Sequence, residues 1–587
     1  MYQLGIGAAL LAVKAFKNLR QKALSEMSTF PRSATGAIAL ASIHANEAMK
    51  VRRAMSWTLP LVIGFVYVTF PTKNYYWDGI SFATSIESSS GLTNSLVHPH
   101  HLLYNVFGYL IYQLAHALGS NARAVHVLQF SNCILAAFCA WLLFRFLLRT
   151  FDSLYLSTLL TLGFAFSSSW WKYATDADAY VPAVFGLLVC LNLIFASAKL
   201  RPVSIGLAHA VSMFFHQLAV FFYPVVLIGI LIPQRLPLRE RFRLALKYSV
   251  VASVVTLATN YYCFHSQTGA FGLAAFFRWL TAYLQGPESY SLSFDLLSAI
   301  RYTLRGQVRL FFEGRFTWLK GLFSVPVILL VGVLIAIVLL LLIRIARELR
   351  SIEFRTLLRQ TADRQIPQTA AWGIFRSFLQ DHRFKPLMYF CSAWILVYLI
   401  FLALWYPYFT PYRLFYLPPI LCLIGVLLNR STDRKLHLLA LLVAGMALSN
   451  FLFFIYPMVH SRNYPPLAFA LQLSEAWQPG STVFYVRSNA DNQLVRYFNP
   501  ATEWKILNAN EQDVTEGYLE GVYQTGKSAW LETSAIDHVL SSVNGAAWLV
   551  SHTRPECSQK LVNNKFRLEF VQIFPQSIAK QPLGCTL

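Results

Sequence analysis

Charged residues are scarce in this chain of 587 residues, because Asp, Glu, Lys and Arg together make up only 13%. Soluble domains carry about 25%. Apolar residues make up 56%. This composition excludes a soluble globular enzyme, a disordered chain and a fibrous repeat. The apolar residues also form long blocks, and residues 322–343 run for 22 positions without a charge. Since about 20 apolar residues suffice for a helix to cross a bilayer, the sequence predicts a polytopic membrane protein.

Several signatures of soluble enzymes are also missing. The eight cysteines contain no CxxC pair, so neither a zinc site nor a redox motif is indicated. No glycine-rich nucleotide loop and no repeat of 20–50 residues occurs. Cys557 and Cys585 are candidates for a disulfide if the polar tail that holds them is extracytoplasmic.

The net charge of +22 would indicate nucleic-acid binding in a soluble protein. Here the Lys and Arg residues lie mostly in short segments between apolar blocks, which is the pattern that marks the cytoplasmic face of a membrane protein. We therefore expect no nucleic-acid partner. The basic residues Lys50, Arg52 and Arg53 precede the first long apolar block, so the N-terminus is expected inside.

Hydropathy and charge together predict an all-α polytopic membrane protein of about eleven transmembrane helices, with the C-terminus outside. Residues 101–118 are expected to lie along the outer surface, because the span before them ends outside and the span after them ends inside. Residues 203–233 have basic flanks on both sides. Those flanks favour two short crossings with a turn near His216 over one long crossing. The predicted spans are 55–70, 124–148, 154–171, 179–198, two within 203–233, 248–264, 322–343, 386–406, 414–429 and 436–457.

The chain divides into three predicted regions. Residues 1–54 form a cytoplasmic N-terminal segment with a short amphipathic helix that suits the membrane surface. Residues 55–457 form the transmembrane domain, with outer loops at 71–123 and 266–320. Residues 458–587 are nearly neutral and form a small extracytoplasmic α/β domain. Its expected strands are the short apolar runs 481–487, 503–507, 528–532 and 546–550.

Acidic, imidazole and guanidinium side chains gather in the segments that are predicted to lie outside. An acid can deprotonate an attacking hydroxyl, and cationic groups can stabilise a leaving phosphate. This combination suits transfer from a membrane-bound phosphate donor. The candidate residues are Asp78, His98, His101, Asp176, Asp178, His216 and Arg413.

Plainer interpretations of these residues stay open. On composition alone, Asp78 is a solvated loop acid beside a turn. His216 lies in an aromatic stretch, where a hydrogen bond across helices explains it equally well. Arg413 has a plainer interpretation as an ordinary interfacial arginine whose charged end reaches water.

Short motifs strengthen the functional interpretation. They are WDG (77–79), HPHHLLYNVFGYLIYQL (98–114), DADAYVPAVF (176–185), GLAHAVSMFFHQLAVFFYP (206–224) and YRLFYLPP (412–419). In these motifs the chain resembles the GT-C superfamily of glycosyltransferases, over most of residues 55–460. It is most similar there to the protein O-mannosyltransferase and lipid A aminoarabinose transferase type. The resemblance implies a polytopic enzyme that uses a sugar linked to a polyprenyl phosphate.

The resemblance also implies roles for the acidic residues. Asp78 corresponds to the catalytic acid of the first extracytoplasmic loop, which acts as base toward the acceptor. Asp178 corresponds to the acid of the second outer loop, which assists the acceptor or a metal, and Asp176 is its neighbour. Gly79 stands where the family commonly has a second acid. This departure weakens the case for a metal-binding pair, and a divalent cation (Mg²⁺ or Mn²⁺) is only a possible cofactor.

The remaining candidates match the family as substrate-binding residues. His98 corresponds to the His before Pro in the interfacial helix, and His101 is a weaker match in the same helix. His216 matches a His of a related family of unknown function. Arg413 matches an arginine that heads a late span and faces the donor phosphate.

The sequence thus predicts a glycosyltransferase that moves a sugar from a polyprenyl-phosphate donor to a glycan, lipid or protein acceptor on the extracytoplasmic face. The expected location is the bacterial inner membrane, where membrane lipids surround it. The main alternative is a transporter or flippase of lipid-linked sugars, which would place its ionisable groups near the midplane of the spans. An O-antigen polymerase or ligase is a third possibility.

Overall fold

The computed structural model describes residues 34–195, 199–232, 236–282, 296–314, 383–429, 433–485, 490–506, 529–532, 560–563 and 568–573. Packing divides the chain into two units, Met1–Leu59 and Pro60–Leu587. Helix α2 (Ala34–Thr69) contains the first predicted span. The predicted N-terminal amphipathic helix, the span at 322–343, the strand at 546–550 and the Cys557–Cys585 pair all lie outside the described residues.

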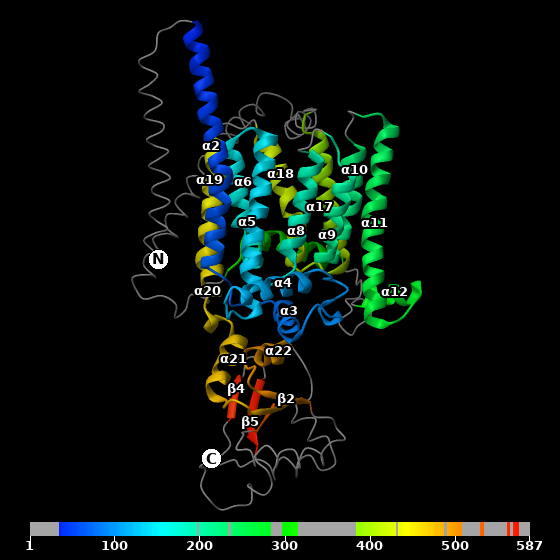
Figure 1. Cartoon of the computed structure of the whole chain (residues 1–587). Helices are drawn as coiled ribbons and strands as arrows, with labels where there is room; N and C mark the ends of the chain where they lie inside the picture. The colour runs from blue at the N-terminus through cyan, green and yellow to red at the C-terminus, as the bar shows by residue number, and fades with distance from the viewer. Residues whose placement is uncertain are drawn as a thin grey trace, which may run out of the picture. The chain divides into compact units, whose positions relative to one another are not determined.

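Apolar helices form the bundle of the second unit (Figure 1). Within the described residues, five helical stretches are long and apolar enough to cross a membrane, and shorter apolar helices accompany them. The chain is therefore an integral membrane protein. The five are Ala124–Phe151, Leu238–Thr268, Lys385–Trp405, Pro411–Leu428 and Arg434–Met458.

The bundle helices fall on the predicted spans, although several are divided. They are α5 (Ala124–Phe151), α6 (Leu154–Ala165), α7 (Ser168–Ala174), α8 (Tyr180–Phe195), α9 (Pro202–Phe215), η2 (Gln217–Phe222), α10 (Tyr223–Leu231), α11 (Leu238–Thr268), α17 (Lys385–Trp405), η6 (Pro411–Tyr416), α18 (Leu417–Leu428), α19 (Asp433–Asn450), η7 (Phe451–Ile455) and α20 (Tyr456–Met458).

The predicted span at 154–171 is not one continuous helix. It ends as α6 at Ala165 and resumes as α7 at Ser168. The hydroxyl of Ser167 donates to the carbonyl oxygen of Phe164 (2.9 Å), which satisfies the end of the first helix. A serine side chain that bonds to nearby backbone competes with helix continuation. The break separates α7 from α6.

The turn predicted near His216 is present. Helix α9 ends at Phe215, and His216 has extended backbone angles (φ −154°, ψ 124°). Its Nδ1 accepts a hydrogen bond from the backbone N–H of Leu218 (3.1 Å), which caps the following 3-10 turn. The break therefore has a local cause, and the two-crossing interpretation stays a prediction.

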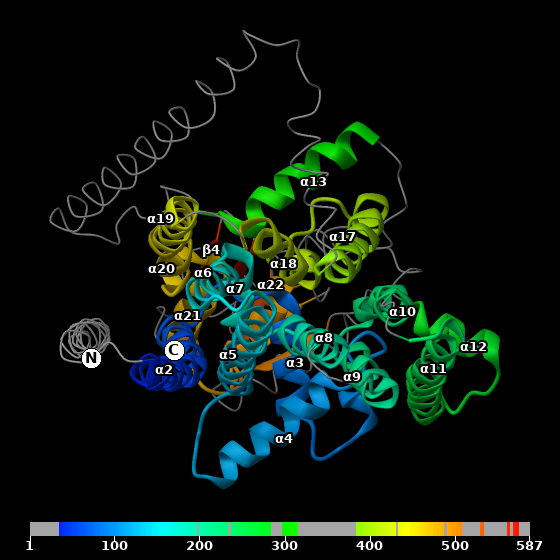
Figure 2. The same cartoon turned by 90° about the horizontal axis from the view of Figure 1, so that it is seen from above.

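Four short helices flank the bundle: α3 (Trp77–Ser88), α4 (Tyr104–Ala117), α12 (Leu273–Leu280) and α13 (Leu296–Phe311). Figure 2, which looks down the bundle, shows α4 and α13 from the side, so both run across its axis. Helix α4 lies within the expected helix at 101–118, and its place on the outer surface stays a prediction. Helix α3 was not expected, since residues 71–100 were predicted to be a polar loop.

Residues after the bundle form a five-stranded sheet of order β2-β1-β3-β5-β4. The strands are β1 (Thr482–Tyr485), β2 (Glu503–Ile506), β3 (Ala529–Glu532), β4 (Lys560–Asn563) and β5 (Leu568–Ile573). β1 pairs in parallel with β2 and β3, and β5 pairs antiparallel with β3 and β4. Helices α21 (Pro465–Ala476) and α22 (Ala490–Phe498) accompany the sheet. The first three strands were predicted, whereas β4 and β5 were not.

Candidate active site

Asp78 lies in the first turn of α3, and the helix begins directly after the extended residue Tyr76. The partial positive charge of a helix N-terminus favours a carboxylate at this position. The next residue, Gly79, is buried against the segment between α7 and α8. A Cβ at Gly79 would lie 2.4 Å from the carbonyl oxygen of Ala177. Glycine at this position therefore allows the first turn of α3 to approach the 176–178 backbone, and a second acid has no room here.

Asp176 is fully buried and holds the two outer segments together. Its Oδ2 accepts from the backbone N–H of Tyr76 (3.0 Å) and from Lys172 Nζ (2.5 Å). Its Oδ1 accepts from the N–H of Ala177 (2.8 Å). Both carboxylate oxygens are therefore occupied. This pattern assigns Asp176 a positioning role beside the site.

Asn132 of α5 supports the same segment from the bundle side. Its Nδ2 donates to the carbonyl oxygens of Asp176 and Asp178, each at 2.7 Å. Asn132 is itself fully buried, and a buried amide that donates to two carbonyls fixes a loop closely. Asn132 and Lys172 were not predicted as site residues, because neither residue type signals chemistry at its position in the sequence.

Asp178 is fully buried as well, but it is less fully bonded. Its Oδ1 accepts from the N–H of Ala179 (2.6 Å), and its Oδ2 has no hydrogen-bond partner among the described residues. Burial, followed by the charges of Asp78 and Asp176, raises the pKa of Asp178 well above its usual value, and Lys172 only partly opposes this. Asp178 therefore retains its proton more readily, and Asp78 is the better candidate for an ionised base.

Three predicted histidines pack against one another near Asp78. The ring centroids of His98 and His101 are 5.7 Å apart, and those of His101 and His216 are 4.7 Å apart. Burial, followed by the neighbouring His216 and His98, lowers the pKa of His101 well below its usual value. The cluster is therefore held largely neutral in the absence of an anion.

The backbone contacts of these histidines indicate which ring nitrogens carry protons. Nδ1 of His98 accepts from the N–H of His100 (3.3 Å), and Nδ1 of His216 accepts from the N–H of Leu218 (3.1 Å). In a neutral ring the other nitrogen then carries the proton. His98 and His216 thus present Nε2–H donors. His101 instead donates through Nδ1 to the carbonyl oxygen of Phe215 (3.1 Å).

A cavity of about 780 Å³ joins these groups. Its polar lining includes Asp78, His98, His101 and His216. Its aromatic lining comes from three separate parts of the chain: Tyr76, Trp77, Phe82, Tyr180, Trp405, Tyr406, Phe409 and Tyr412. Pockets that are mostly apolar and hold a few convergent polar groups are the usual sites for small ligands.

Four of the seven predicted site residues thus line one cavity. Two more, Asp176 and Asp178, flank Ala177, against which the first turn of α3 packs. Arg413 is different. It is fully buried, and its guanidinium donates to the carbonyl oxygens of Phe409 (2.7 Å) and Pro407. It also packs against Gly306 of α13, where a Cβ would lie 2.1 Å from its Cζ. Arg413 is not a lining residue, and its contacts hold the 405–412 segment whose aromatic rings face the cavity.

No group of three or more His, Cys, Asp or Glu side chains in the described part of the chain is arranged to hold a metal ion. The possible divalent cation therefore stays a prediction.

Comparison with solved structures agrees with this arrangement at the level of the fold. The structure of ArnT from Cupriavidus metallidurans bound to undecaprenyl phosphate superposes with a TM-score of 0.55 at 12% identity, over 89% of this chain and 97% of that chain. The apo ArnT structure superposes with a TM-score of 0.53 at 12% identity, over 92% of this chain and 100% of that chain. AglB, an archaeal oligosaccharyltransferase from Archaeoglobus fulgidus, superposes with a TM-score of 0.37 at 12% identity, over 85% of this chain and 72% of that chain. Comparison of sequences finds no matching family model and no matching curated protein.

ArnT is an aminoarabinose transferase of the GT-C type. The resemblance to GT-C glycosyltransferases that the sequence motifs indicated is therefore confirmed as a shared fold. At 12% identity the comparison speaks for the fold alone.

Proposed function

We propose that this protein is a membrane glycosyltransferase that moves a sugar from a polyprenyl-phosphate donor to an acceptor on the extracytoplasmic face. The observation that carries the proposal is the lining of the 780 Å³ cavity, which brings Asp78 together with four histidines, three of them predicted as site residues. The fold adds support, since the ArnT structure that shares it was solved with undecaprenyl phosphate bound.

In the proposed reaction, Asp78 accepts the proton of an acceptor hydroxyl while its oxygen attacks the anomeric carbon of the donor sugar. The new bond joins the acceptor oxygen to that carbon, and the bond from the carbon to the phosphate oxygen breaks. The polyprenyl phosphate leaves with the bonding electron pair. A single displacement of this kind inverts the anomeric configuration. Asp178, which burial favours in its protonated form, helps keep the negative charge on Asp78.

The leaving phosphate is proposed to lie against His98 and His216. Both line the cavity and carry their proton on Nε2, and N–H donors stabilise developing charge on phosphate oxygens. An anion at this place would also favour protonation of the imidazoles and so strengthen both hydrogen bonds. Arg413 contributes indirectly, by holding the aromatic 405–412 segment.

The proposal is tested with a panel of radiolabelled polyprenyl-phosphate sugars in membranes that contain the protein, compared with membranes of the same host without it. We expect consumption of one donor and release of polyprenyl phosphate only where the protein is present. Addition of EDTA shows whether a divalent cation is required. If no donor is consumed and the labelled lipid instead crosses between leaflets, the protein is a flippase and the proposal is wrong.

A further inference from the structure

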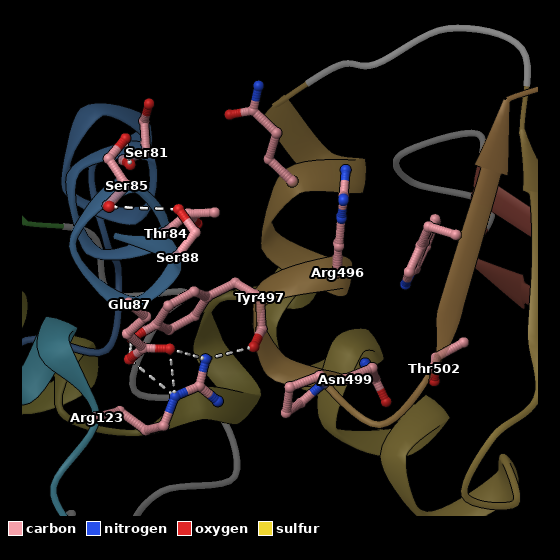
Figure 3. Close-up of a pocket in the computed structure, with 13 residues that line it drawn as sticks. Ser81, Thr84, Ser85, Glu87, Ser88, Arg123, Arg496, Tyr497, Asn499 and Thr502 are labelled. Atoms are coloured by element: carbon pink, nitrogen blue, oxygen red, sulfur yellow. Dashed lines mark hydrogen bonds and ion pairs between the residues drawn. The ribbon is translucent and has the colours of Figure 1, made fainter. Parts of the chain in front are cut away.

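A second cavity of about 540 Å³ adjoins the first. Three residues line both cavities: Ser81 and Ser85 of α3, and Gln493 of α22. One wall of the second cavity is α3, and the opposite wall belongs to the C-terminal domain (Figure 3). We call it the α3–α22 cleft. The two cavities therefore meet at these residues, and Asp78 lines the first of them.

The α3 wall is made of hydroxyl groups. Asp78, Ser81, Ser85 and Ser88 follow one another at spacings of three and four residues, so they share one face of the helix. The hydroxyls of Ser85 and Ser88 donate to the carbonyl oxygens of Ser81 (3.0 Å) and Ser85 (3.3 Å). Thr84, also in the wall, donates to the carbonyl oxygen of Ile80 (2.8 Å). With their protons engaged in this way, the oxygens face the cleft as acceptors, which suits a ligand rich in O–H groups.

The opposite wall is polar too. It contains Gln493, Arg496, Asn499, Thr502 and Trp504. Figure 3 shows Arg496 and Thr502 across from the hydroxyls of α3. Hydroxyl, amide and guanidinium groups together with an indole ring are the groups that bind sugar rings, through hydrogen bonds and an apolar platform. The described residues of the lining form no continuous apolar surface of the kind that an acyl chain would need.

A bonded network fixes the distance between the two walls. Arg123 Nε donates to both oxygens of Glu87 (2.9 Å each), and its Nη2 donates to the carbonyl oxygen of Tyr497 (2.8 Å). Glu87 also accepts from the hydroxyl of Tyr497 (2.7 Å) and from the N–H of Ala124 (2.7 Å). These contacts connect the end of α3, the start of α5 and α22. The cleft is therefore a preformed feature.

The charges in the lining leave the cleft positive. Among the described residues of the lining, Glu87 is the one carboxylate, and Arg123 neutralises it in an ion pair of 2.7 Å. Arg496 is the second lining arginine, and no salt bridge joins it to another described residue. A ligand that carries an anionic group would therefore be favoured over a neutral one.

We infer that the α3–α22 cleft is the acceptor site and that the acceptor is a carbohydrate with an acidic substituent. This inference rests on the proposed function. The acceptor sugar lies along the hydroxyls of α3, with its anionic group at Arg496 and its reacting hydroxyl toward Asp78. The reaction is the one given above, in which the acceptor proton passes to Asp78 and the polyprenyl phosphate departs.

Binding is tested without catalysis, in the full-length protein in detergent. Ser88→Cys places a thiol in the cleft, and Thr268→Cys places one on the exposed end of α11 as a control. Each variant is labelled with a hydrophilic maleimide in the presence of oligosaccharides of glucuronic acid, neutral oligosaccharides of N-acetylglucosamine, or a Ser/Thr-rich peptide. At an oligosaccharide concentration of about ten times its Kd, labelling at position 88 should slow about tenfold, and labelling at 268 should not change.

We expect the acidic oligosaccharide to protect position 88 more strongly than the neutral one. Protection by the peptide alone would show that the acceptor is a polypeptide, and absence of protection by any of the three would show that the cleft is not an acceptor site. Either result overturns the inference and leaves the donor assay unaffected. Failure of the donor assay, in contrast, would remove the proposed function while the labelling result still reports on the cleft.

Arg496→Gln separates acceptor binding from chemistry. Loss of a charge-assisted contact should raise the KM for the acceptor by about tenfold or more. Slow hydrolysis of the donor by water, measured without acceptor, is followed in parallel as a separate readout of the chemistry. Arg462→Gln is the matched control, because Arg462 is exposed and does not line the cleft. An unchanged KM in Arg496→Gln would contradict the assignment of Arg496.

Discussion

Gly79 determines how closely Asp78 approaches the second outer segment. The absence of a side chain lets the first turn of α3 lie against the carbonyl oxygen of Ala177. In the sequence this glycine is only a departure from the pattern of a doubled acid. In the structure it is the condition for placing Asp78 beside Asp178, whose pKa responds to the charge of Asp78.

Gly79→Ala is therefore expected to reduce both stability and transfer. The added Cβ has no space at 2.4 Å from a backbone oxygen, and strain of this kind costs about 1–3 kcal/mol. The measurement is thermal unfolding in detergent together with the transfer rate. Gly91→Ala is the control, since a Cβ at that position meets nothing within 4 Å. Equal behaviour of the two variants would show that the close approach at Gly79 is unimportant.

The histidine cluster makes stability depend on pH. Burial lowers the pKa of His101 in the folded protein, and the pKa values of His98 and His100 are lowered as well. Between the usual histidine pKa of about 6.5 and the lowered value, the unfolded chain binds a proton that the folded chain does not. Stability therefore falls as pH decreases below about 6.5, by at most about 1.4 kcal/mol per pH unit for each histidine.

His101→Gln should weaken this dependence. Melting temperatures of wild type and variant between pH 8 and pH 5 would converge toward acidic pH, because the variant no longer carries the imidazole that resists protonation. The loss of stability at acidic pH that His98 and His100 cause should remain in both proteins. A constant difference between the two curves across this range would contradict the assignment.

Sequence reasoning found Asp78 and the three histidines because unusual residue types stood at predicted membrane boundaries. It did not find Lys172 or Asn132, since a lysine and an asparagine beside apolar blocks carry no chemical signature. The sequence also did not reveal why Asp176 and Asp178 differ in their hydrogen bonding. That difference depends on which carboxylate lies within reach of Lys172, a matter of three-dimensional packing.

At the scale of elements, α3 links the two cavities. Its first turn carries Asp78, its middle carries the shared serines, and its end carries Glu87. Although burial alone raises the pKa of Glu87, hydrogen bonds from Arg123 and Tyr497 outweigh it and lower that pKa. The ionised form of Glu87 is therefore stabilised, and it connects α3 to α22.

Glu87→Gln should loosen the contact between α3 and the C-terminal domain. Loss of charge-assisted hydrogen bonds costs roughly 1.5–3 kcal/mol. We expect a lower melting temperature and faster proteolysis within residues 458–506. Glu503→Gln is the comparison, because its ion pair with Lys505 lies at the surface and such pairs contribute at most about 1 kcal/mol. If Glu503→Gln is as damaging as Glu87→Gln, the network does not hold the walls together.

The long apolar helices were predictable because hydropathy alone identifies a stretch that can cross a bilayer. The helix breaks were less accessible. Ser167 ends α6 through a hydrogen bond to the backbone carbonyl of Phe164. A hydropathy profile does not detect such a bond. Helix α3 escaped prediction because its sequence, WDGISFATSIES, mixes serine, glycine and acids. It forms a helix by packing its buried face, which includes Ile80, Phe82 and Ile86.

At the scale of the whole molecule, the central expectation is that the site and the C-terminal domain lie on the extracytoplasmic side. The basic residues Lys199 and Arg201 mark the opposite face. A periplasmic phosphatase reporter is active only outside the cytoplasm. Fusions after residue 460 should be active, and fusions after residue 200 should be inactive. An inactive fusion after residue 460 would require an even number of crossings and would move the domain inside.

The most direct test of the proposed function compares wild type, Asp78→Asn and Asp78→Glu for transfer of labelled sugar from the polyprenyl-phosphate donor that the wild type consumes. Asp152→Asn serves as control, because Asp152 caps the other end of α5 with a positive φ of 54° that asparagine also tolerates. Removal of a general base should lower the rate by about 10²–10⁴-fold. We predict that loss for Asp78→Asn with unchanged melting temperature, partial activity for Asp78→Glu, and full activity for the control. Full activity in a folded Asp78→Asn variant would contradict the role of Asp78 as the base.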